Sequence, residues 1–242
     1  MDSISIIRTP IESELEAFKE LYDSSLSSSN TLLDSVVAHI RQRSGKMMRP
    51  ILVLLVARLY GVVSPATLHA AVSLELLHNA SLVHDDVVDE STERRGQLSV
   101  NAIFNNKVAV LTGDYLLATS LVHAELTNSH QIIRLVSSLG QDLADGELLQ
   151  LSNVSNHSFS ETVYFDVIRK KTAALFAACT EAAAYSVGVS EEEVKLARLL
   201  GEYIGICFQI KDDIFDYFDS KEIGKPTGND ICLLYTSDAA DE

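Results

Sequence analysis

The chain has 242 residues and a formal net charge of −15 at pH 7, so a surface for nucleic acid or anionic membrane is not expected. Its 3 cysteines are widely spaced and include no CxxC pair, which argues against a disulfide framework or a zinc site and favours a reducing, cytoplasmic setting. We find no signal-peptide pattern and no apolar span of ~20 residues that could cross a membrane.

Apolar residues recur at helical spacing, and only 11 glycines and 4 prolines interrupt them. This pattern predicts an all-α bundle in one domain, with serine-rich breaks at residues 24–30 and 152–158. A serine three residues before a glutamate, or directly before a proline, indicates a helix start. Such serines are Ser13, Ser64, Ser158 and Ser190. The expected helices cover residues 11–23, 31–43, 47–60, 65–91, 106–126, 130–150, 159–186 and 190–218.

Three aspartates crowd the end of the expected helix 65–91, in the stretch LVHDDVVDE. Asp85 and Asp89 are four residues apart and share a helix face, whereas Asp86 lies about 100° round the axis. Like charges at this spacing repel, and the helix dipole disfavours anions near a C-terminus. A hard divalent cation reverses both effects, because carboxylate oxygens are its preferred ligands. Taken alone, the cluster also fits a solvated acidic helix end.

A second acidic cluster, in FQIKDDIFDYF (208–218), repeats the pattern after another apolar run. Its acids are Asp212, Asp213 and Asp216. Two such clusters beside core-like residues fit carboxylates that face each other across a bundle and hold metal ions. Magnesium binds through one or two carboxylates and takes its other ligands from water and phosphate oxygens. The two clusters therefore favour metals bound around a diphosphate, and neither has the ligand spacing of an EF-hand.

The few basic residues are also clustered. The clusters are Lys46 with Arg49, Arg94 with Arg95, and Arg169 with Lys170 and Lys171. Arginine binds phosphate oxygens bidentately and lysine supplies a mobile point charge, so these clusters indicate two phosphorylated substrates, although each alone fits an ordinary surface. His78, two turns before Asp85, and Gln209, just before the second acidic cluster, either donate to a diphosphate or are plain helix residues.

Together these blocks resemble the trans-isoprenyl diphosphate synthases, or polyprenyl synthetases, of the long-chain octaprenyl and heptaprenyl type. LLHNASLVHDDVVDESTERRG (76–96) is similar to the first aspartate-rich region of that family. GKMMRP, LTGDYLLA, RKKTA, FQIKDDIFDYF and the beginning of a last block, GKPTGND, are similar to further blocks in the same order. The resemblance covers about residues 8–231. It implies an all-α isoprenoid synthase-type bundle around a deep central cavity, a homodimer, and Mg²⁺ as cofactor.

The resemblance also implies a role for individual residues. The ligands of Mg²⁺ on the allylic diphosphate are Asp85, Asp86, Asp89, Asp212, Asp213 and Asp216. The same diphosphate is bound by Arg94, Lys171 and Gln209, assisted by Lys225. Isopentenyl diphosphate is bound by Lys46, Arg49, His78 and Arg95. Thr172 lies near the allylic cation, which forms when the C–O bond breaks and is attacked by the double bond of isopentenyl diphosphate.

Other functions explain fewer of these features. A class I terpene cyclase also starts from a metal-bound diphosphate, but it typically has a different second metal motif and no block like GKMMRP. A non-catalytic subunit of a heteromeric prenyl synthase usually loses acids or basic ligands that this chain keeps. A plain metal-binding bundle explains the acids but not the cations.

Product length is expected to depend on residues one turn below the first acidic cluster. Ala80 and Ser81 are small, whereas short-chain members of the family often carry bulky aromatics at these positions. Leu74 and Leu77 lie deeper on nearly the same face and either narrow the cavity or belong to the ordinary core. By resemblance we predict a long product of about C30 to C40, with a farnesyl or geranylgeranyl diphosphate synthase as the shorter-chain alternative.

The sequence departs from the family's pattern after GKPTGNDI. The family continues with another GK block and more helices, whereas this chain reads CLLYTSDAADE (232–242). That stretch resembles a translated sequencing adapter. We therefore expect a polyprenyl synthetase domain at 1–231 that lacks its C-terminal helices, followed by a non-native tail at 232–242.

Overall fold

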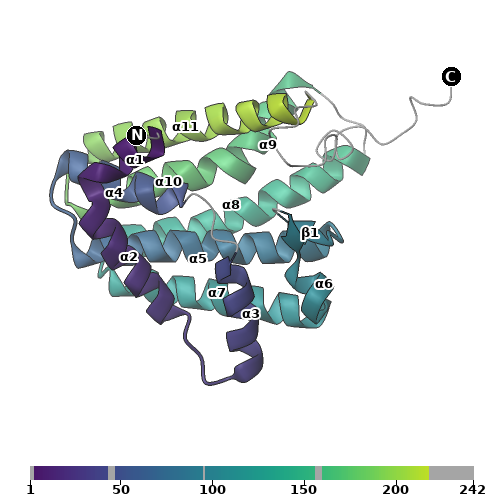
Figure 1. Ribbon diagram of the computed structural model, residues 1–242. Coiled ribbons are helices and arrows are strands. Elements are labelled where there is room, and N and C mark those ends of the chain that lie inside the picture. Colours follow the sequence, from purple (N-terminus) through teal and green to yellow (C-terminus); the bar gives the residue numbers. More distant parts are fainter. Residues whose placement is uncertain (1–2, 43–46, 95, 156–159, 218–242) are drawn as a thin grey trace.

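The computed structural model describes residues 3–42, 47–94, 96–155 and 160–217, without the side chains of residues 3–4, 153–155 and 216–217. Within these residues the protein is a helical bundle with one small hairpin, which confirms the predicted all-α class (Figure 1). The elements are α1 (Ser3–Arg8), η1 (Thr9–Ile11), α2 (Glu12–Ser25), α3 (Thr31–Gln42), α4 (Met48–Tyr60), α5 (Pro65–Val88), β1 (Glu93–Arg94), β2 (Gln97–Leu98), α6 (Val100–Phe104), α7 (Asn106–Leu126), α8 (His130–Ser155), α9 (Glu161–Ile168), η2 (Arg169–Ala173), α10 (Ala174–Ser186) and α11 (Glu191–Tyr217).

Helix α5 runs through the middle of the bundle and packs against α7, α10, α4 and α2 (Figure 1). Ser64 starts it as predicted, because its hydroxyl accepts the N–H of Thr67 at 3.3 Å while the Thr67 hydroxyl accepts the N–H of Ser64 at 3.1 Å. Leu74 and Leu76 are fully buried in the core. Each such leucine contributes about 2 kcal/mol through its burial, so α5 is both the centre of the core and the support of the first acidic cluster.

Several segments differ from the expected helices. Helices α1 and α6 were not expected, and α8 continues to Ser155, into the break expected at 152–158. Between the expected helices 65–91 and 106–126, strands β1 and β2 pair antiparallel, with Glu93 opposite Leu98. The helix expected over 159–186 is divided by η2, a π-helical turn that spans the RKKTA block. Turns of this kind interrupt α-helices frequently at functional sites, which makes η2 a candidate part of such a site.

One predicted helix start is wrong and another lies outside the described residues. Helix α2 already begins at Glu12, and the Ser13 hydroxyl donates to Glu14 instead of capping a helix. Ser158 and the tail 232–242 lie outside the described residues. None of the described helices is both long and apolar enough to span a bilayer.

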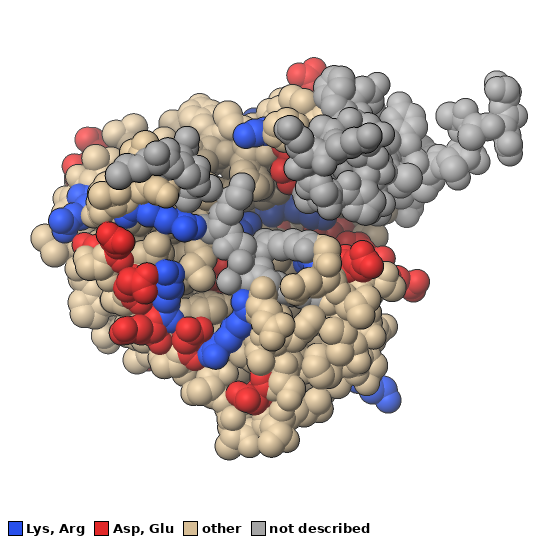
Figure 2. Space-filling view, in the orientation of Figure 1, with Lys and Arg blue, Asp and Glu red and all other residues tan. Residues whose placement is uncertain are grey.

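Acidic and basic side chains are mixed over the outer face of α2 (Figure 2). Lys19 pairs with Glu16 at 2.6 Å, and Arg58 of α4 approaches Glu14 at 3.5 Å. Exposed pairs of this kind contribute at most about 1 kcal/mol each, so they tune the surface but do not hold the bundle together.

A pair of histidines, His123 buried and His69 half-buried, joins α5 to α7 and gives the fold a predictable response to acid. The Nδ1 atoms of His69 and His123 are 3.0 Å apart. Burial, and then the charge of His69, lower the pKa of His123 from 6.5 to about 4, and burial also lowers the pKa of His69. Between these pH values the unfolded chain binds more protons than the folded protein, so acid favours unfolding.

Allowing for partial screening by solvent, we expect the free energy of unfolding to fall by about 2 kcal/mol as the pH drops through this interval. Urea titrations at a series of pH values measure this slope. His123→Asn should reduce the slope of the free energy of unfolding against pH, whereas His130→Gln, at an exposed position, should leave this slope unchanged. An identical slope in His123→Asn and in the wild type would contradict the assignment.

Candidate active site

The first acidic cluster lies where α5 ends. The helix closes with a Schellman motif, in which the N–H of Ser91 donates to the carbonyl of Asp86 at 2.9 Å and Glu90 adopts a left-handed φ of 50°. Asp85 is therefore in the last turn, half-buried, while Asp89 is the C-cap residue and is exposed. The C-terminal ends of α5 and α11, which carry the two acidic clusters, lie at the same end of the bundle (Figure 1).

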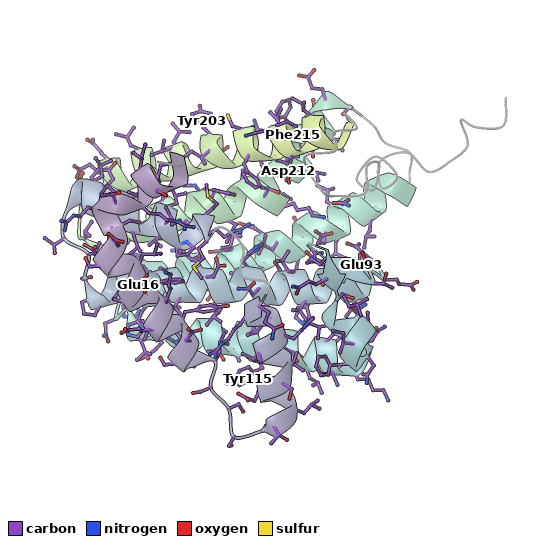
Figure 3. The ribbon with its side chains drawn as sticks, viewed as in Figure 1. Glu16, Glu93, Tyr115, Tyr203, Asp212 and Phe215 are labelled. Atoms are coloured by element: carbon purple, nitrogen blue, oxygen red, sulfur yellow. The ribbon has the colours of Figure 1, made fainter. Side chains whose placement is uncertain are left out.

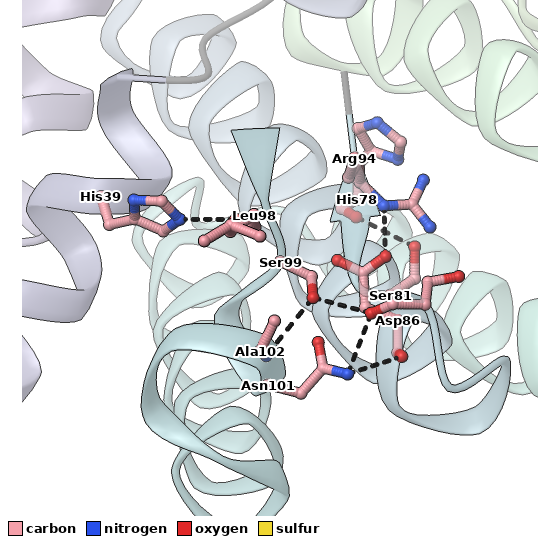
Figure 4. A network of polar contacts seen from close by, with 10 residues as sticks. His39, His78, Ser81, Asp86, Arg94, Leu98, Ser99, Asn101 and Ala102 are labelled. Carbon is pink, nitrogen blue, oxygen red and sulfur yellow. Dashed lines mark hydrogen bonds and ion pairs between the residues drawn. The ribbon is translucent and has the colours of Figure 1, made fainter. Parts of the chain in front are cut away.

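Asp86 is buried, with 1% of its surface exposed, and forms an ion pair with Arg94 of β1. The Nε–H of Arg94 donates to Asp86 Oδ1 at 2.6 Å (Figure 4). Asn101 of α6 holds the same turn, because its amide donates to the carbonyls of Asp86 at 3.1 Å and Ser91 at 3.0 Å. Removing one partner from a buried pair costs about 3–5 kcal/mol, so Asp86 and Arg94 shape this loop as well as being candidate ligands.

The second acidic cluster is held by a chain of hydrogen bonds. The Gln209 amide donates to Asp213 Oδ1 at 2.7 Å, and the Tyr164 hydroxyl of α9 donates to Asp213 Oδ2 at 2.5 Å. The Thr172 hydroxyl donates to Gln209 Oε1 at 2.7 Å. Burial and the bond to Asp213 raise the pKa of Tyr164, which keeps it a donor. Asp212 lies on the side of α11 that faces the bundle (Figure 3).

The π-helical turn η2 connects the two acidic clusters. Lys171 Nζ lies 2.7 Å from Glu147 Oε1 and 3.0 Å from Gln150 Oε1, both on α8. The positive charge of Lys171 also lowers the pKa of Asp85 in the first cluster. Thr172, the next residue, is bonded through Gln209 to the second cluster. The adjacent residues Lys171 and Thr172 therefore interact with different clusters: Lys171 acts on the first through its charge, and Thr172 is linked to the second through Gln209.

The carboxyl group of Asp85 is strongly perturbed. Burial is the first cause that raises its pKa, to about 6, and the charge of Glu147 is the second. Lys171 and Arg94 act in the opposite direction, and Asp89 adds a smaller upward contribution. A half-buried carboxylate in such a field gains more from a bound cation than an ordinary surface aspartate does.

The residues predicted to bind the second diphosphate are on α4 and deeper along α5. The guanidinium of Arg49 lies 5.5 Å from the ring centroid of Phe176. His78 is buried, and its carbonyl accepts the Ser81 hydroxyl at 2.9 Å (Figure 4). Ala80 is buried in the core. Lys46, Arg95, Lys225 and the side chain of Asp216 lie outside the described residues.

The LTGDYLLA block supports the first acidic cluster by packing. A Cβ atom at Gly113 of α7 would overlap the His84 imidazole. His84 Nε2 lies 3.4 Å from the carboxylate of Asp114 in the same block. The glycine thus lets α7 approach the residue that directly precedes Asp85.

The sequence profile described as polyprenyl synthetase matches residues 30–236. The chain belongs to the polyprenyl synthetase family. Heptaprenyl diphosphate synthase component 2 of Geobacillus stearothermophilus is 38% identical over 225 residues, which cover 91% of this chain and 69% of that protein. Octaprenyl diphosphate synthase of Escherichia coli (strain K12) is 36% identical over 207 residues, covering 85% of this chain and 64% of that protein. The chain thus spans about two thirds of the length of these relatives.

Solved structures share the fold of this polyprenyl synthetase. Geranylgeranyl pyrophosphate synthase from Bacteroides thetaiotaomicron is 76% identical with a TM-score of 0.81, covering 96% of this chain and 70% of that one. A polyprenyl synthase from Caulobacter crescentus CB15, solved with calcium and isoprenyl diphosphate, is 32% identical with a TM-score of 0.90, covering 96% and 71%. The isoprenoid synthase-type helical fold predicted from the sequence is confirmed.

The acids of this polyprenyl synthetase offer oxygen ligands of the kind that a hard divalent cation prefers. Among the described residues, no three His, Cys, Asp or Glu side chains are close enough to hold a metal by themselves. Magnesium, however, needs only one or two carboxylates when water and phosphate oxygens complete its shell. Asp85 and Asp89 offer hard oxygen ligands at the end of α5, so the donor set is of the right kind.

Three residues at this site were not predicted from the sequence: Glu147, Gln150 and Tyr164. Glu147 and Gln150 are three apart and share a face of α8, so their spacing was an available signal. Tyr164 has no such signal, because its bond to Asp213 joins positions 49 residues apart.

Proposed function

We propose that this polyprenyl synthetase is a prenyltransferase that joins isopentenyl diphosphate to an allylic diphosphate with Mg²⁺ as cofactor. The arrangement of η2 carries the proposal: Lys171 bonds to Glu147 and its charge acts on Asp85, while Thr172 is bonded through Gln209 to Asp213 of the second acidic cluster. A cationic turn between two groups of carboxylates suits a diphosphate with its metal ions. Because the chain spans about two thirds of its curated relatives, the proposal concerns the whole protein.

Each predicted residue has a place in this proposal. The proposed Mg²⁺ ligands are Asp85, Asp86, Asp89, Asp212, Asp213 and Asp216. When bound, Mg²⁺ would neutralise charge on the leaving diphosphate. Lys171, Arg94 and Gln209 donate to the same diphosphate, with Lys225, and so stabilise the charge that develops on the departing oxygen. Lys46, Arg49, His78 and Arg95 bind isopentenyl diphosphate, and the Thr172 hydroxyl lies near the reacting carbon.

We propose a long product, of about C30 to C40, from the small residues below the first acidic cluster. Ala80 is buried, and the Ser81 hydroxyl turns back to its own helix, so neither adds bulk there. A C20 product is a second candidate, because a solved chain that is 76% identical is titled geranylgeranyl pyrophosphate synthase.

Bulk at either position should shorten the product. Ala80→Phe or Ser81→Phe places an aromatic ring one turn below Asp85, where the growing tail has to pass. We expect the main product to lose at least about one prenyl unit, while the first condensation continues at a similar rate. Chromatography of the released prenyl alcohols measures this. Unchanged chain length in both variants would contradict the proposed path of the tail.

We also propose a homodimer formed through α7. Val110, Leu111, Leu121 and Val122 are 39%, 68%, 43% and 56% exposed, respectively. Residues eleven apart lie three turns apart on one face, so these four side chains form an apolar stripe that a second copy can cover.

Charge on this stripe should separate the subunits. Leu111→Glu combined with Val122→Glu should give the monomer mass in sedimentation, whereas the wild type gives twice that mass. Leu59→Glu changes an equally exposed leucine, 72% exposed on α4, and should remain dimeric. A dimeric stripe variant would contradict this interface, and a monomeric wild type would favour the heteromeric alternative.

A product assay tests the proposed function. The protein is supplied with labelled isopentenyl diphosphate, farnesyl diphosphate and Mg²⁺, and the prenyl alcohols released by phosphatase are sized. The proposal predicts elongated, labelled alcohols that require the metal, and the same assay separates C20 from longer products. No incorporation by the whole protein would contradict it.

A further inference from the structure

Two adjacent lysines of η2 form ion pairs with two acids of α8. Lys170 Nζ lies 2.5 Å from Asp145 Oδ2, and Lys171 Nζ lies 2.7 Å from Glu147 Oε1. A Cβ atom at the intervening Gly146 would lie 3.1 Å from Lys170 Cβ, so the glycine lets the two elements approach. The outer pair is 42% and 64% exposed, whereas the inner pair is 35% and 23% exposed. The two pairs are chemically alike, but only the inner one belongs to the site.

The charges of the inner pair act on Asp85 of the first acidic cluster. The charge of Glu147 raises the pKa of Asp85, and the charge of Lys171 lowers it. The lysine ammonium has three N–H donors, and Glu147 and Gln150 accept two of them. The cation that the proposed function assigns to a diphosphate is therefore already neutralised by a carboxylate.

The charges around this pair do not favour a free anion. The acids are Asp85, Asp86, Asp89 and Glu147, and the cations are Arg94 and Lys171. Counted over the described residues alone, four negative and two positive charges leave a net charge of −2, which repels pyrophosphate. One divalent cation has the charge needed to cancel this field.

We propose that Glu147 is a positioning residue that masks Lys171 in the metal-free site and thereby makes diphosphate binding depend on Mg²⁺. The inference rests on the proposed function, since it assumes that Lys171 binds the diphosphate. Without metal, pyrophosphate has to displace Glu147 from the ammonium within a negative field. With the acids neutralised by Mg²⁺, the field no longer opposes that exchange.

Calorimetric binding of inorganic pyrophosphate to the full chain, with Mg²⁺ and again with EDTA, tests the proposal. Glu147→Gln removes one negative charge and keeps the shape of the side chain, so we expect about tenfold tighter binding in EDTA. Asp145→Asn makes the same charge change at the outer pair and should alter binding by less than about twofold. Glu147→Asp keeps the charge and should retain the dependence of the wild type on Mg²⁺.

A double variant shows whether the higher affinity for pyrophosphate depends on Lys171. Glu147→Gln with Lys171→Gln should bind pyrophosphate no better than Lys171→Gln alone. The proposal is overturned if Glu147→Gln does not raise the affinity for pyrophosphate in EDTA, or if Asp145→Asn raises it equally. It is also overturned if the higher affinity persists in the double variant that lacks Lys171. Weaker binding by Glu147→Gln in both conditions, with a lowered melting temperature, also overturns it, since that result marks a purely structural role. No binding by the wild type even with Mg²⁺ instead overturns the proposed function.

Discussion

Asp85→Asn should lower kcat/KM for prenyl transfer by at least about a thousandfold, because it removes a charge that a hard cation requires. Asparagine keeps the size of the side chain. Burial and Glu147 raise the pKa of Asp85 to about 6, so the ionised carboxylate is held in an unfavourable environment. Its replacement by a neutral group should leave the melting temperature unchanged or raise it slightly. Lost activity with kept stability, measured by incorporation of labelled isopentenyl diphosphate and by thermal melts, is the expected combination.

Glu90→Gln is the matched control for this experiment. Glu90 lies at the same helix end and is exposed, so the substitution makes the same change of charge without touching the proposed ligands. We expect activity within about threefold of the wild type. Equal losses of activity in both variants would mean that the effect comes from the change of net charge and not from a lost ligand. Full activity in Asp85→Asn would contradict a role of the first acidic cluster in the reaction.

Gly201→Ala should lower the free energy of unfolding by about 3 kcal/mol or more. A Cβ atom at this position of α11 would lie 2.7 Å from the Cα atom of Ala177 and closer still to the Thr180 hydroxyl and the Phe176 carbonyl. Backbone atoms of α10 cannot move aside cheaply, so α11 has to shift. Because α11 carries Gln209 and the second acidic cluster, activity should fall as well.

Gly140→Ala provides the comparison for this second prediction. Within the part of the chain that the structure describes, no atom beyond the helix itself lies within 4 Å of a Cβ built at Gly140 on α8, so alanine should stabilise the helix by about 0.5–1 kcal/mol. Denaturant titrations of the two variants give the two values. Similar stabilities for both would mean that α10 and α11 do not pack as closely as described.

Features set by neighbours in the sequence could be predicted. Ser64 and Ser190 start α5 and α11 because their capping partners lie within three residues; the Ser190 hydroxyl accepts the N–H of Glu193 at 3.3 Å, and Glu193 Oε2 accepts the N–H of Ser190 at 2.9 Å. The acidic and basic clusters could be picked out for a similar reason, since each is local in the chain, and their roles stay a prediction.

Features that depend on distant residues could not be predicted in the same way. The π-helical turn divides an otherwise continuous apolar pattern, and its side chains contact α8 and α11. Asp86 and Arg94 were assigned separately to metal and diphosphate, although the hairpin after α5 brings them into one ion pair. The role of Glu147 could not be predicted from its local sequence, because it depends on the approach of α8 to η2 at Gly146.

The most direct measurement is the binding of geranyl diphosphate to the protein by calorimetry, first with Mg²⁺ and then with EDTA. If carboxylates of the two clusters and the cations of η2 and β1 bind a diphosphate through a divalent metal, binding is tight with Mg²⁺, is lost in EDTA, and is absent in Asp85→Asn under both conditions. Equal affinity with and without the metal, unaffected by Asp85→Asn, would contradict it.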